Sequence, residues 1–325
     1  MFKRILVPLD GSARAEAALP HALALAQIGD VEVILQQVLQ EPDTNRSVDP
    51  VEWHLQSSAS ESYLKMACAK IRETGVRVQC HLLSGSPPDR LIEQAESLEV
   101  DLMVVASHGH TGRKEWQLGG VARKLLEGVG TSLLLVNART ANDSALEFAP
   151  IRYERILTPL DGSRRSECVL PIAEQLVAAH DAELILGHVV QLPSILAWPM
   201  LPEEDRRVAN ELVELTYNTA KEYLEQHQAR QQGRTAIALA RATNVAMELG
   251  RLVDEQNIDL ILLSAHGAAP NLQRAFGDTA AALLHYARQA ILIYQDRPQT
   301  NHEEEEAAPR RGRLADPEHE NNLIL

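Results

Sequence analysis

Along this chain, short runs of apolar residues alternate with longer stretches in which apolar residues recur every three or four positions. Near-continuous apolar runs are typical of parallel strands whose two faces are both covered. The stretches between them, for example Leu19, Leu23 and Ala26, have the spacing of helices with one buried stripe. This alternation predicts an α/β fold with a doubly wound parallel sheet and right-handed crossovers. In the first half of the chain the strand-like runs are residues 5–7, 33–35, 76–78, 102–105 and 133–136.

The same pattern occurs twice. Residues 4–38 align without gaps to residues 155–189, with 19 identities in 35 positions. Residues 101–109 recur as residues 259–267. The sequence therefore predicts two tandem domains of one fold, called repeat one and repeat two below. Each is expected to have a mainly five-stranded parallel sheet with helices on both faces.

The boundaries of the two domains follow from changes in composition. We expect domain one over residues 1–139 and domain two over residues 152–296. Residues 140–151 carry turn formers without a sustained period and are predicted to be a linker. Residues 297–325 are charged and nearly free of core-forming residues, so we expect a disordered acidic tail there.

Composition and charge disfavour several classes of protein. The 325 residues are 45% hydrophobic and carry a formal net charge of −14. That charge opposes binding to nucleic acid, because such affinity depends largely on neutralising phosphates. No apolar run reaches the roughly 18 residues that span a membrane, and a strand-like start leaves no room for a signal peptide. Cys68, Cys80 and Cys168 have the spacing of neither a disulfide framework nor a zinc site, so we expect a protein of the reducing cytoplasm.

A carboxylate follows the first strand of each repeat. Residues 7–12 (VPLDGS) recur as residues 158–163 (TPLDGS). In an open α/β sheet, ligands bind beyond the carboxyl ends of the strands, where the strand order reverses. Asp10 at that place could accept ribose hydroxyls or hold a cation. Alternatively, Asp10 caps the turn while Ser12 caps the following helix.

A second candidate segment follows the fourth strand. Residues 106–109 (ASHG) are followed by nine residues and then by Gly119 and Gly120, which begin a helix. Small residues let main-chain N–H groups approach a phosphate, and a helix N-terminus adds unsatisfied donors and the positive end of its dipole. His108 is interpreted as a turn histidine that bonds to backbone, because the sequence shows no third metal ligand beside it and His110.

Together these segments resemble the universal stress protein family, over nearly all of residues 1–296 and once in each repeat. The resemblance implies a Rossmann-like, nucleotide-binding fold of five parallel strands and a role in the stress response. One branch of the family binds ATP through Gly-x-x-Gly, nine residues, Gly, and then Ser or Thr. Repeat one has Ala106 for the first glycine and Gly120 for the hydroxyl residue. A phosphate could still be held there with one side-chain hydrogen bond fewer, a loss of about 1 kcal/mol.

The resemblance also implies which residues surround an ATP molecule, with or without Mg²⁺. The adenine would pack against Val38, with Pro8 and Asp10 on the base and ribose side. Arg113 could reach the phosphates or be solvated. The predicted set in repeat one is Pro8, Asp10, Val38, Ala106, Ser107, His108, Gly109, Gly112, Arg113, Gly119, Gly120 and Val121.

Repeat two departs further from the family pattern. It keeps the glycine spacing but has Asp278 where the hydroxyl residue should stand. A carboxylate facing a phosphate costs about 4 kcal/mol at roughly 4 Å and an effective dielectric constant of about 20, unless a metal bridges them. We therefore predict a weaker second site, formed by Pro159, Asp161, Val189, Gly267 and Gly277.

Two functional interpretations are compatible with these observations. The first is a cytosolic stress-response regulator that binds ATP chiefly in repeat one, with no catalytic residue assigned and at most weak ATP hydrolysis. The second is a tandem interaction module that binds no nucleotide and acts through protein partners. The resemblance implies that residues 133–136 and 291–294 pair the two repeats as a pseudo-dimer within one chain, and two chains could form a further dimer. The apolar loop 191–202, with Trp198 and Met200, is a lid or an association surface, or else it is buried against its own domain.

Overall fold

The computed structural model describes residues 2–40, 49–107, 118–137, 148–268, 276–286 and 288–295. Strands and helices alternate in both repeats, as the apolar pattern predicts. The elements of repeat one are β1 (Arg4–Leu9), α1 (Ala13–Glu16), α2 (Ala18–Ala26), β2 (Glu32–Gln40), α3 (Pro50–Glu73), β3 (Arg77–Gly85), α4 (Pro87–Ser97), β4 (Leu102–Ala106), α5 (Gly120–Gly128) and β5 (Ser132–Val136). Those of repeat two are β6 (Arg155–Pro159), α6 (Arg164–Glu167), α7 (Leu170–His180), β7 (Glu183–Gln191), the 3-10 helix η2 (Ser194–Ala197), α8 (Glu203–Gln228), β8 (Thr235–Ala242), α9 (Val245–Glu255), β9 (Leu260–Ser264), α10 (Asp278–Tyr286) and β10 (Ala290–Tyr294).

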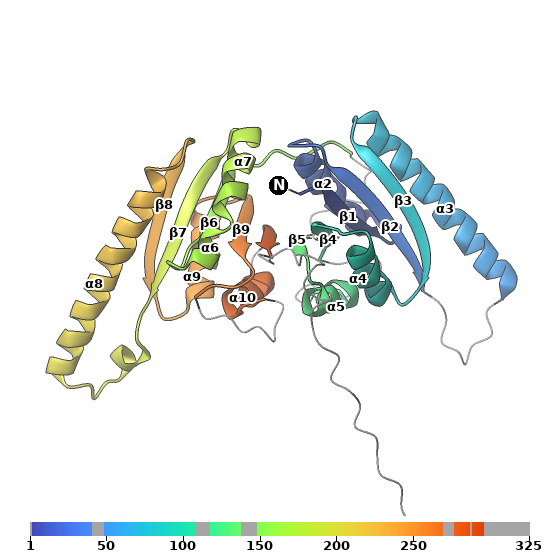
Figure 1. Cartoon of the computed structure of the whole chain (residues 1–325). Coiled ribbons are helices and arrows are strands. Elements are labelled where there is room, and N and C mark those ends of the chain that lie inside the picture. Colours follow the sequence, from blue (N-terminus) through green and yellow to red (C-terminus); the bar gives the residue numbers. More distant parts are fainter. Residues whose placement is uncertain are drawn as a thin grey trace, which may run out of the picture.

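The strands of both repeats form one ten-stranded sheet in the order β3-β2-β1-β4-β5-β10-β9-β6-β7-β8 (Figure 1). The strands within each repeat are parallel. Strands β5 and β10 pair antiparallel in the middle, with Leu134 opposite Leu292. The predicted α/β fold of two doubly wound halves is confirmed, and so is the pairing of their last strands within one chain.

Two hydrophobic cores cover the two faces of the sheet, because successive strand residues point to opposite sides. Ile5 of β1 belongs to one core and Leu6 to the other. The first core is completed by residues of α1, α2 and α3 and of α7 and α8. The second is completed by residues of α4 and α5 and of α9 and α10. Each core contains residues of both repeats, so the duplication forms a single layered body.

The first helical region is interrupted at the same place in both repeats. Pro20 and Pro171 lie in the first turns of α2 and α7, where a missing N–H removes no intrahelical hydrogen bond. In repeat one, α1 ends at Glu16 and α2 begins at Ala18. The interruption leaves the short α1 attached to the turn that follows β1.

A buried aromatic cluster lies where repeat two begins. Tyr153 is 1% exposed, and its hydroxyl lies 2.9 Å from Nδ1 of His21 in α2. Its backbone N–H donates to Nδ1 of His180 in α7 at 3.4 Å. Burial lowers the pKa of His21 to about 4, so this histidine is neutral at pH 7. Because the N–H of Ile151 also donates to the carbonyl of Pro20 at 3.3 Å, the segment before β6 is attached to repeat one.

Two of the three cysteines form a disulfide, which corrects the expectation from their spacing. Cys68 of α3 and Cys80 of β3 are 12 residues apart in sequence, and their Cα atoms are 6.5 Å apart. Disulfides bridge Cα atoms at such distances. The spacing did not reveal the pair because a turn at Thr74 and Gly75 reverses the chain, so that β3 returns alongside α3.

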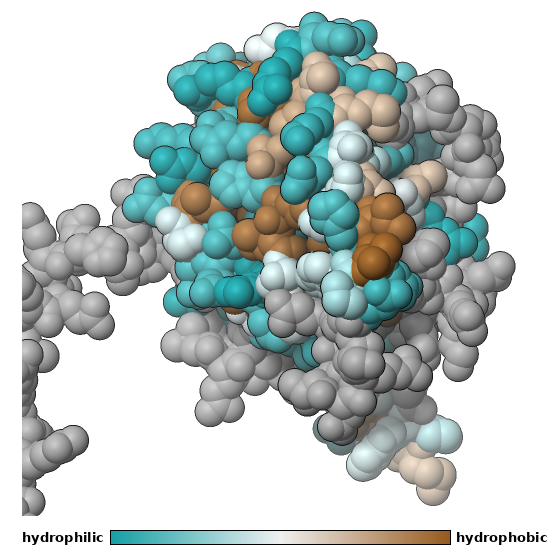
Figure 2. Space-filling model, turned by 90° about the vertical axis from the view of Figure 1, so that its right-hand side faces the viewer, coloured by the Kyte–Doolittle hydropathy of each residue, from teal (hydrophilic) through white to brown (hydrophobic). Residues whose placement is uncertain are grey.

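Both repeats expose apolar side chains on their outer surfaces, among them Val51 and Leu55 of α3 in repeat one. Figure 2 shows the side of the molecule that bears α3, where hydrophobic and hydrophilic residues are interspersed. In repeat two, Trp198 and Met200 are 63% and 90% exposed. We considered that the apolar loop 191–202 is buried against its own domain, and for these two side chains that alternative is wrong.

Candidate functional site

The strand order of repeat one reverses between β1 and β4. Strand β1 lies between β2 and β4, with Leu6 opposite Met103 of β4. The carboxyl ends of β1 and β4 therefore meet at one edge of the sheet, and the predicted site residues Asp10 and Ser107 follow them directly. Such reversal points are where α/β sheets bind ligands. The fold thus brings the two candidate segments of repeat one to one place.

Asp10 organises the turn after β1. Its Oδ1 accepts hydrogen bonds from the backbone N–H of Ser12 at 3.0 Å and from the Ser12 hydroxyl at 2.6 Å. The Ser12 Oγ accepts from the N–H of Ala15 at 3.2 Å and caps α1. Gly11 between them has a φ of +79°, which glycine adopts without strain. The capping interpretation of Asp10 and Ser12 is confirmed, and a ligand contact by Asp10 stays a prediction.

The same turn recurs in repeat two and there contacts the loop after β9. Asp161 Oδ1 accepts from the N–H and hydroxyl of Ser163 at 3.0 and 2.6 Å, and its Oδ2 accepts from the N–H of Ala268 at 2.8 Å. A Cβ on Gly267 would clash with Oδ2 of Asp161, so a larger residue there would displace this carboxylate. Burial alone would raise the pKa of Asp161, but these hydrogen bonds to the charged form outweigh it and lower the pKa. Two members of the predicted weaker site, Asp161 and Gly267, are therefore in contact.

The end of β4 is connected to the start of α5. The N–H of Gly119 donates to the carbonyl of Ser107 at 2.8 Å, and in repeat two the N–H of Gly277 donates to the carbonyl of Ala265 at 2.7 Å. Gly119 is the N-cap residue of α5 and makes no side-chain cap. The first amides of α5 therefore lie close to the end of β4 without a side-chain acceptor from the N-cap. This arrangement suits an anion.

The first turns of the two corresponding helices differ in charge. That of α5 contains no acidic residue, whereas α10 begins with Asp278. The helix dipole places partial positive charge at each N-terminus, and Asp278 offsets this charge in α10. A Cβ at Gly120 would meet no described atom within 4 Å, so the first turn of α5 has room for a side chain or a ligand atom.

The other predicted residues differ in exposure. Pro8 and Val38 are half-buried on the paired strands β1 and β2, and Val121 is 37% exposed in the first turn of α5. In repeat two, Pro159 is half-buried and Val189 is 9% exposed. Outside the described residues lie His108, Gly109, Gly112 and Arg113.

Sequence reasoning missed Gln36 of β2, which lies opposite Pro8 of β1. The side chain is 0% exposed, and neither its Nε2 nor its Oε1 has a hydrogen-bond partner among the described residues. A buried polar group left unpaired costs about 1–3 kcal/mol. At the alignment offset of 151, repeat two has Gly187 in this place. The available signal was that a glutamine directly follows the apolar run 33–35 in a central strand.

A second feature missed from the sequence is a carboxylate–phenol pair beside each aspartate turn. The hydroxyl of Tyr63 in α3 donates to Glu16 at 2.7 Å, and that of Tyr223 in α8 donates to Glu167 at 2.9 Å. Burial raises the pKa of Glu16, although the Tyr63 hydroxyl opposes the shift. The two glutamates match at the alignment offset, but the tyrosines do not, so comparison of the repeats did not find the pair.

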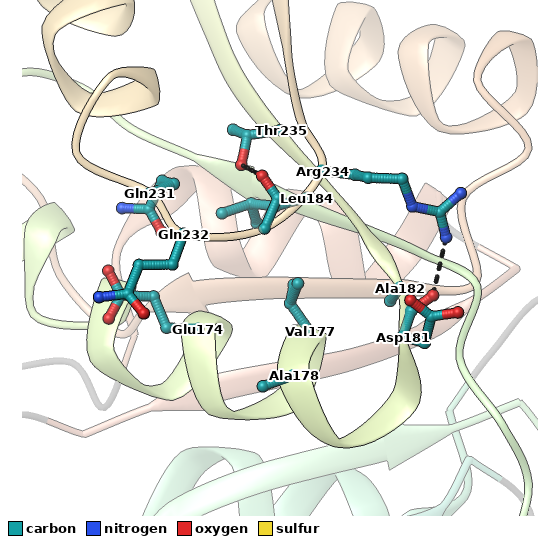
Figure 3. A pocket seen from close by; sticks show the side chains of 11 residues that line it. Glu174, Val177, Ala178, Asp181, Ala182, Leu184, Gln231, Gln232, Arg234 and Thr235 are labelled. Atoms are coloured by element: carbon teal, nitrogen blue, oxygen red, sulfur yellow. Dashed lines mark hydrogen bonds between the residues drawn. The ribbon is translucent and has the colours of Figure 1, made fainter.

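Other features lie away from this edge or belong to other classes of site. A cavity of about 360 Å³ lies in repeat two at the amino ends of β7 and β8, where Arg234 donates to the carbonyl of Asp181 at 2.8 Å (Figure 3). It is at the opposite end of the strands from Asp161 and contains none of the predicted residues.

The described residues hold no group of three or more His, Cys, Asp or Glu suited to a metal ion, and no helix with the length and apolarity to cross a membrane.

Comparison with known proteins agrees with this geometry. The model of the universal stress protein family matches residues 1–137 and again residues 152–295. The chain belongs to the universal stress protein family. The two matched segments make it a tandem member, with one universal stress protein domain in each half of the ten-stranded sheet.

Individual universal stress proteins match one or both repeats. Universal stress protein MJ0577 from Methanocaldococcus jannaschii is 28% identical over 159 residues, which cover 43% of this chain and 98% of that protein. Universal stress protein MJ0531 from the same organism is 31% identical over 143 residues, which cover 42% of this chain and 82% of that protein. The crystal structure of a universal stress protein from Archaeoglobus fulgidus covers 90% of this chain and 98% of its own, with a TM-score of 0.61 and 17% identity. This structural likeness shows that the fold extends over both repeats.

Proposed function

We propose that this universal stress protein binds an adenine nucleotide, ATP, in repeat one and acts as a cytoplasmic regulator in the stress response. The observation that carries the proposal is the hydrogen bond from the Gly119 N–H to the Ser107 carbonyl at 2.8 Å. It holds the start of α5 close to the end of β4, at the reversal point of the strand order and beside the Asp10 turn. A helix N-terminus at such a point favours a phosphate. The proposal concerns binding and includes no catalytic step.

The strands β1 and β2 supply the proposed base and ribose side. Pro8 and Val38 are half-buried near the carboxyl ends of these paired strands and offer apolar contact to a base. Asp10 is exposed at the carboxyl end of β1, and a carboxylate is a suitable acceptor for a ribose hydroxyl. Phosphates would then extend toward the first turn of α5, with Mg²⁺ bound mainly through phosphate oxygens and water.

Repeat two is the weaker site in this proposal because of one charge. Asp278 places a negative charge in the first turn of α10, where phosphates would lie. This charge lowers the affinity of repeat two for a nucleotide.

A matched pair of variants tests the assignment. Gly119→Asp places a carboxylate at the start of α5, and Gly277→Asp makes the same change in repeat two, where a Cβ would lie 3.4 Å from the carbonyl oxygen of Ala265. With the full chain in equilibrium dialysis against ATP and Mg²⁺, we expect Gly119→Asp to lose at least about 100-fold in affinity, from the charge repulsion. Gly277→Asp should bind as the wild type does. Binding that survives Gly119→Asp but not Gly277→Asp would show that the site has been assigned to the wrong repeat.

A second candidate function is association with a protein partner through repeat two. Val208, Leu212 and Leu215 of α8 are 59%, 58% and 64% exposed, at a spacing that places them on one face of the helix. Trp198 and Met200 lie exposed just before the same helix. Exposed apolar groups that cluster in this way mark interaction surfaces. If the surface serves a second copy of the chain, light scattering should show a concentration-dependent dimer that Leu212→Glu abolishes; a monomer at every concentration would exclude that partner.

A further inference from the structure

The cysteine pair of repeat one joins two outer elements of the molecule. Cys68 lies in α3 and is 2% exposed, whereas Cys80 is half-buried in β3, the edge strand of the sheet. Their disulfide links the long outer helix to that strand across the turn at Thr74 and Gly75. Cys80 is therefore the more accessible residue of the pair.

Repeat two builds the same helix–strand pair without cysteines. Cys80 lies opposite Leu35 of β2, and the matching pair in repeat two is Ile237 opposite Leu186 of β7. Leu35 and Leu186 are equivalent at the alignment offset of 151. Because isoleucine fills the same place in repeat two, apolar packing alone does not account for Cys80.

The third cysteine provides an internal reference. Cys168 follows α6 in repeat two, is half-buried, and takes no part in the disulfide. Cys168 and Cys80 are both half-buried. A reagent that oxidises accessible thiols in general would therefore react with Cys168 as well as with the pair. A specific reaction of Cys68 with Cys80 is therefore distinguishable from general oxidation.

We propose that Cys68 and Cys80 form a reversible dithiol–disulfide couple, which a hydroperoxide oxidises and a small dithiol reduces. The structure contains the oxidised form of this couple. The couple makes the α3–β3 unit of repeat one sensitive to oxidants, and repeat two has no equivalent. It does not depend on nucleotide binding.

Oxidation proceeds in two steps. The thiolate of Cys80 attacks one oxygen of the hydroperoxide, so that an S–O bond forms, the O–O bond breaks, and the leaving alkoxide takes up a proton to become an alcohol. The thiol of Cys68 then attacks the sulfenic sulfur of Cys80, forming the S–S bond and releasing hydroxide, which takes the Cys68 proton and leaves as water. In sum, two thiols and one hydroperoxide give one disulfide, one alcohol and one water; when the oxidant is hydrogen peroxide, a second water takes the place of the alcohol. Reduction by a dithiol reverses the bond through a mixed disulfide.

The couple changes how firmly α3 is held against β3. A disulfide restricts the unfolded chain and so stabilises the folded one, here by closing the short loop between residues 68 and 80. We expect reduction to lower the Tm of the full chain by about 3–6 °C. Amide hydrogen exchange should rise in α3 and β3, while their counterparts α8 and β8 stay unchanged.

The test measures thiols in the full chain. Protein is treated with dithiothreitol or with a few equivalents of hydrogen peroxide, denatured, alkylated with iodoacetamide and weighed intact. After dithiothreitol we expect all three cysteines to be alkylated, and after peroxide only one, which peptide mapping should identify as Cys168. The matched control is Cys80→Ser, which should keep two alkylated cysteines after peroxide and show a Tm insensitive to dithiothreitol.

Two results would overturn the proposal. One is alkylation of all three cysteines after peroxide, which would mean that the pair does not oxidise. The other is a wild-type Tm that dithiothreitol leaves unchanged, which would mean that the bond does not hold α3 against β3. Neither readout uses ATP, so failure here is separate from failure of the proposed nucleotide site.

Discussion

The two repeats share their strand order and their aspartate turn, yet they differ where the helix after the fourth strand begins. The first turn of α5 contains no acidic residue, whereas α10 begins with Asp278. Repeat one also has Gln36 and Cys80 where repeat two has Gly187 and Ile237. The two repeats keep the same fold because their apolar residues recur in the same pattern, and this pattern determines which faces of the strands and helices are buried. The strand ends are less constrained by the core, so their chemistry can diverge between copies.

The largest expected effect is a gain of nucleotide binding in repeat two. Asp278→Ser removes the carboxylate and supplies the hydroxyl of the family pattern. Relief of a repulsion of about 4 kcal/mol corresponds to roughly 1000-fold in affinity, so isothermal titration with ATP should change from one site to two. Asp278→Asn, which removes only the charge, serves as the control. If neither variant binds a second ATP, the charge of Asp278 does not account for the difference between the two repeats.

The next effect concerns the junction of the repeats and its response to pH. The pKa of His21 is about 4 in the folded chain, below its usual value of 6.5. As the pH falls, this imidazole is therefore protonated in the unfolded chain before it is protonated in the folded one. The stabilisation is fully present above pH 6.5 and is lost as the pH falls toward 4. Between pH 7 and pH 5 we expect the unfolding free energy to fall by about 2 kcal/mol from this group. His21→Gln should remove that part of the dependence in urea titrations; equal pH slopes for variant and wild type would contradict the prediction.

A smaller effect is expected at Gln36. Gln36→Leu replaces a buried amide, unpaired among the described residues, with an apolar side chain of similar size. The unfolding free energy should rise by about 1–2 kcal/mol, because the desolvation cost of the amide is removed. Gln37→Leu is the control: the Gln37 Nε2 donates to the Ser60 hydroxyl at 3.2 Å and only its Oε1 lacks a partner among the described residues, so this change should stabilise the chain less than Gln36→Leu does. A destabilised Gln36→Leu would mean that bound water or a ligand satisfies the amide.

The smallest effect is expected at the start of α5. Gly120→Ser restores the hydroxyl of the family pattern at a position where a Cβ meets no described atom within 4 Å. One added hydrogen bond to a phosphate is worth about 1 kcal/mol, so ATP should bind roughly 5-fold more tightly. Gly120→Ala, which adds a Cβ without a hydroxyl, controls for the change in helix propensity. Equal affinities for the two variants would show that no phosphate lies beside this residue.

The fold could be predicted from the sequence wherever burial determines the pattern. The apolar runs 102–105 and 133–136 coincide with β4 and β5, two central strands covered on both faces. The run 76–78 marked only the beginning of β3, which extends to Gly85, because most side chains of this edge strand are half-buried and polar residues interrupt its apolar run. Because the pattern occurs twice, each strand and helix assignment in one repeat was supported by its counterpart in the other.

The candidate site could be predicted only in part. Asp10 and Ser107 were predicted as site residues because both directly follow apolar runs, and the structure places the ends of these two strands side by side. The burial of Gln36 and the meeting of Cys68 with Cys80 depend on how α3 and β3 pack, which spacing along the chain does not encode. The exposure of Trp198 could not be predicted either, because an apolar residue in a loop is equally compatible with a buried and an exposed position.

The most direct test of the account is the number of ATP molecules bound by the nucleotide-free full chain in isothermal titration with Mg²⁺. The account predicts one site per chain, in repeat one, because the first turn of α10 carries Asp278 and that of α5 carries no acid. Two sites of similar affinity would contradict the proposed difference between the repeats. No binding up to millimolar ATP would contradict nucleotide binding itself and favour the interaction module.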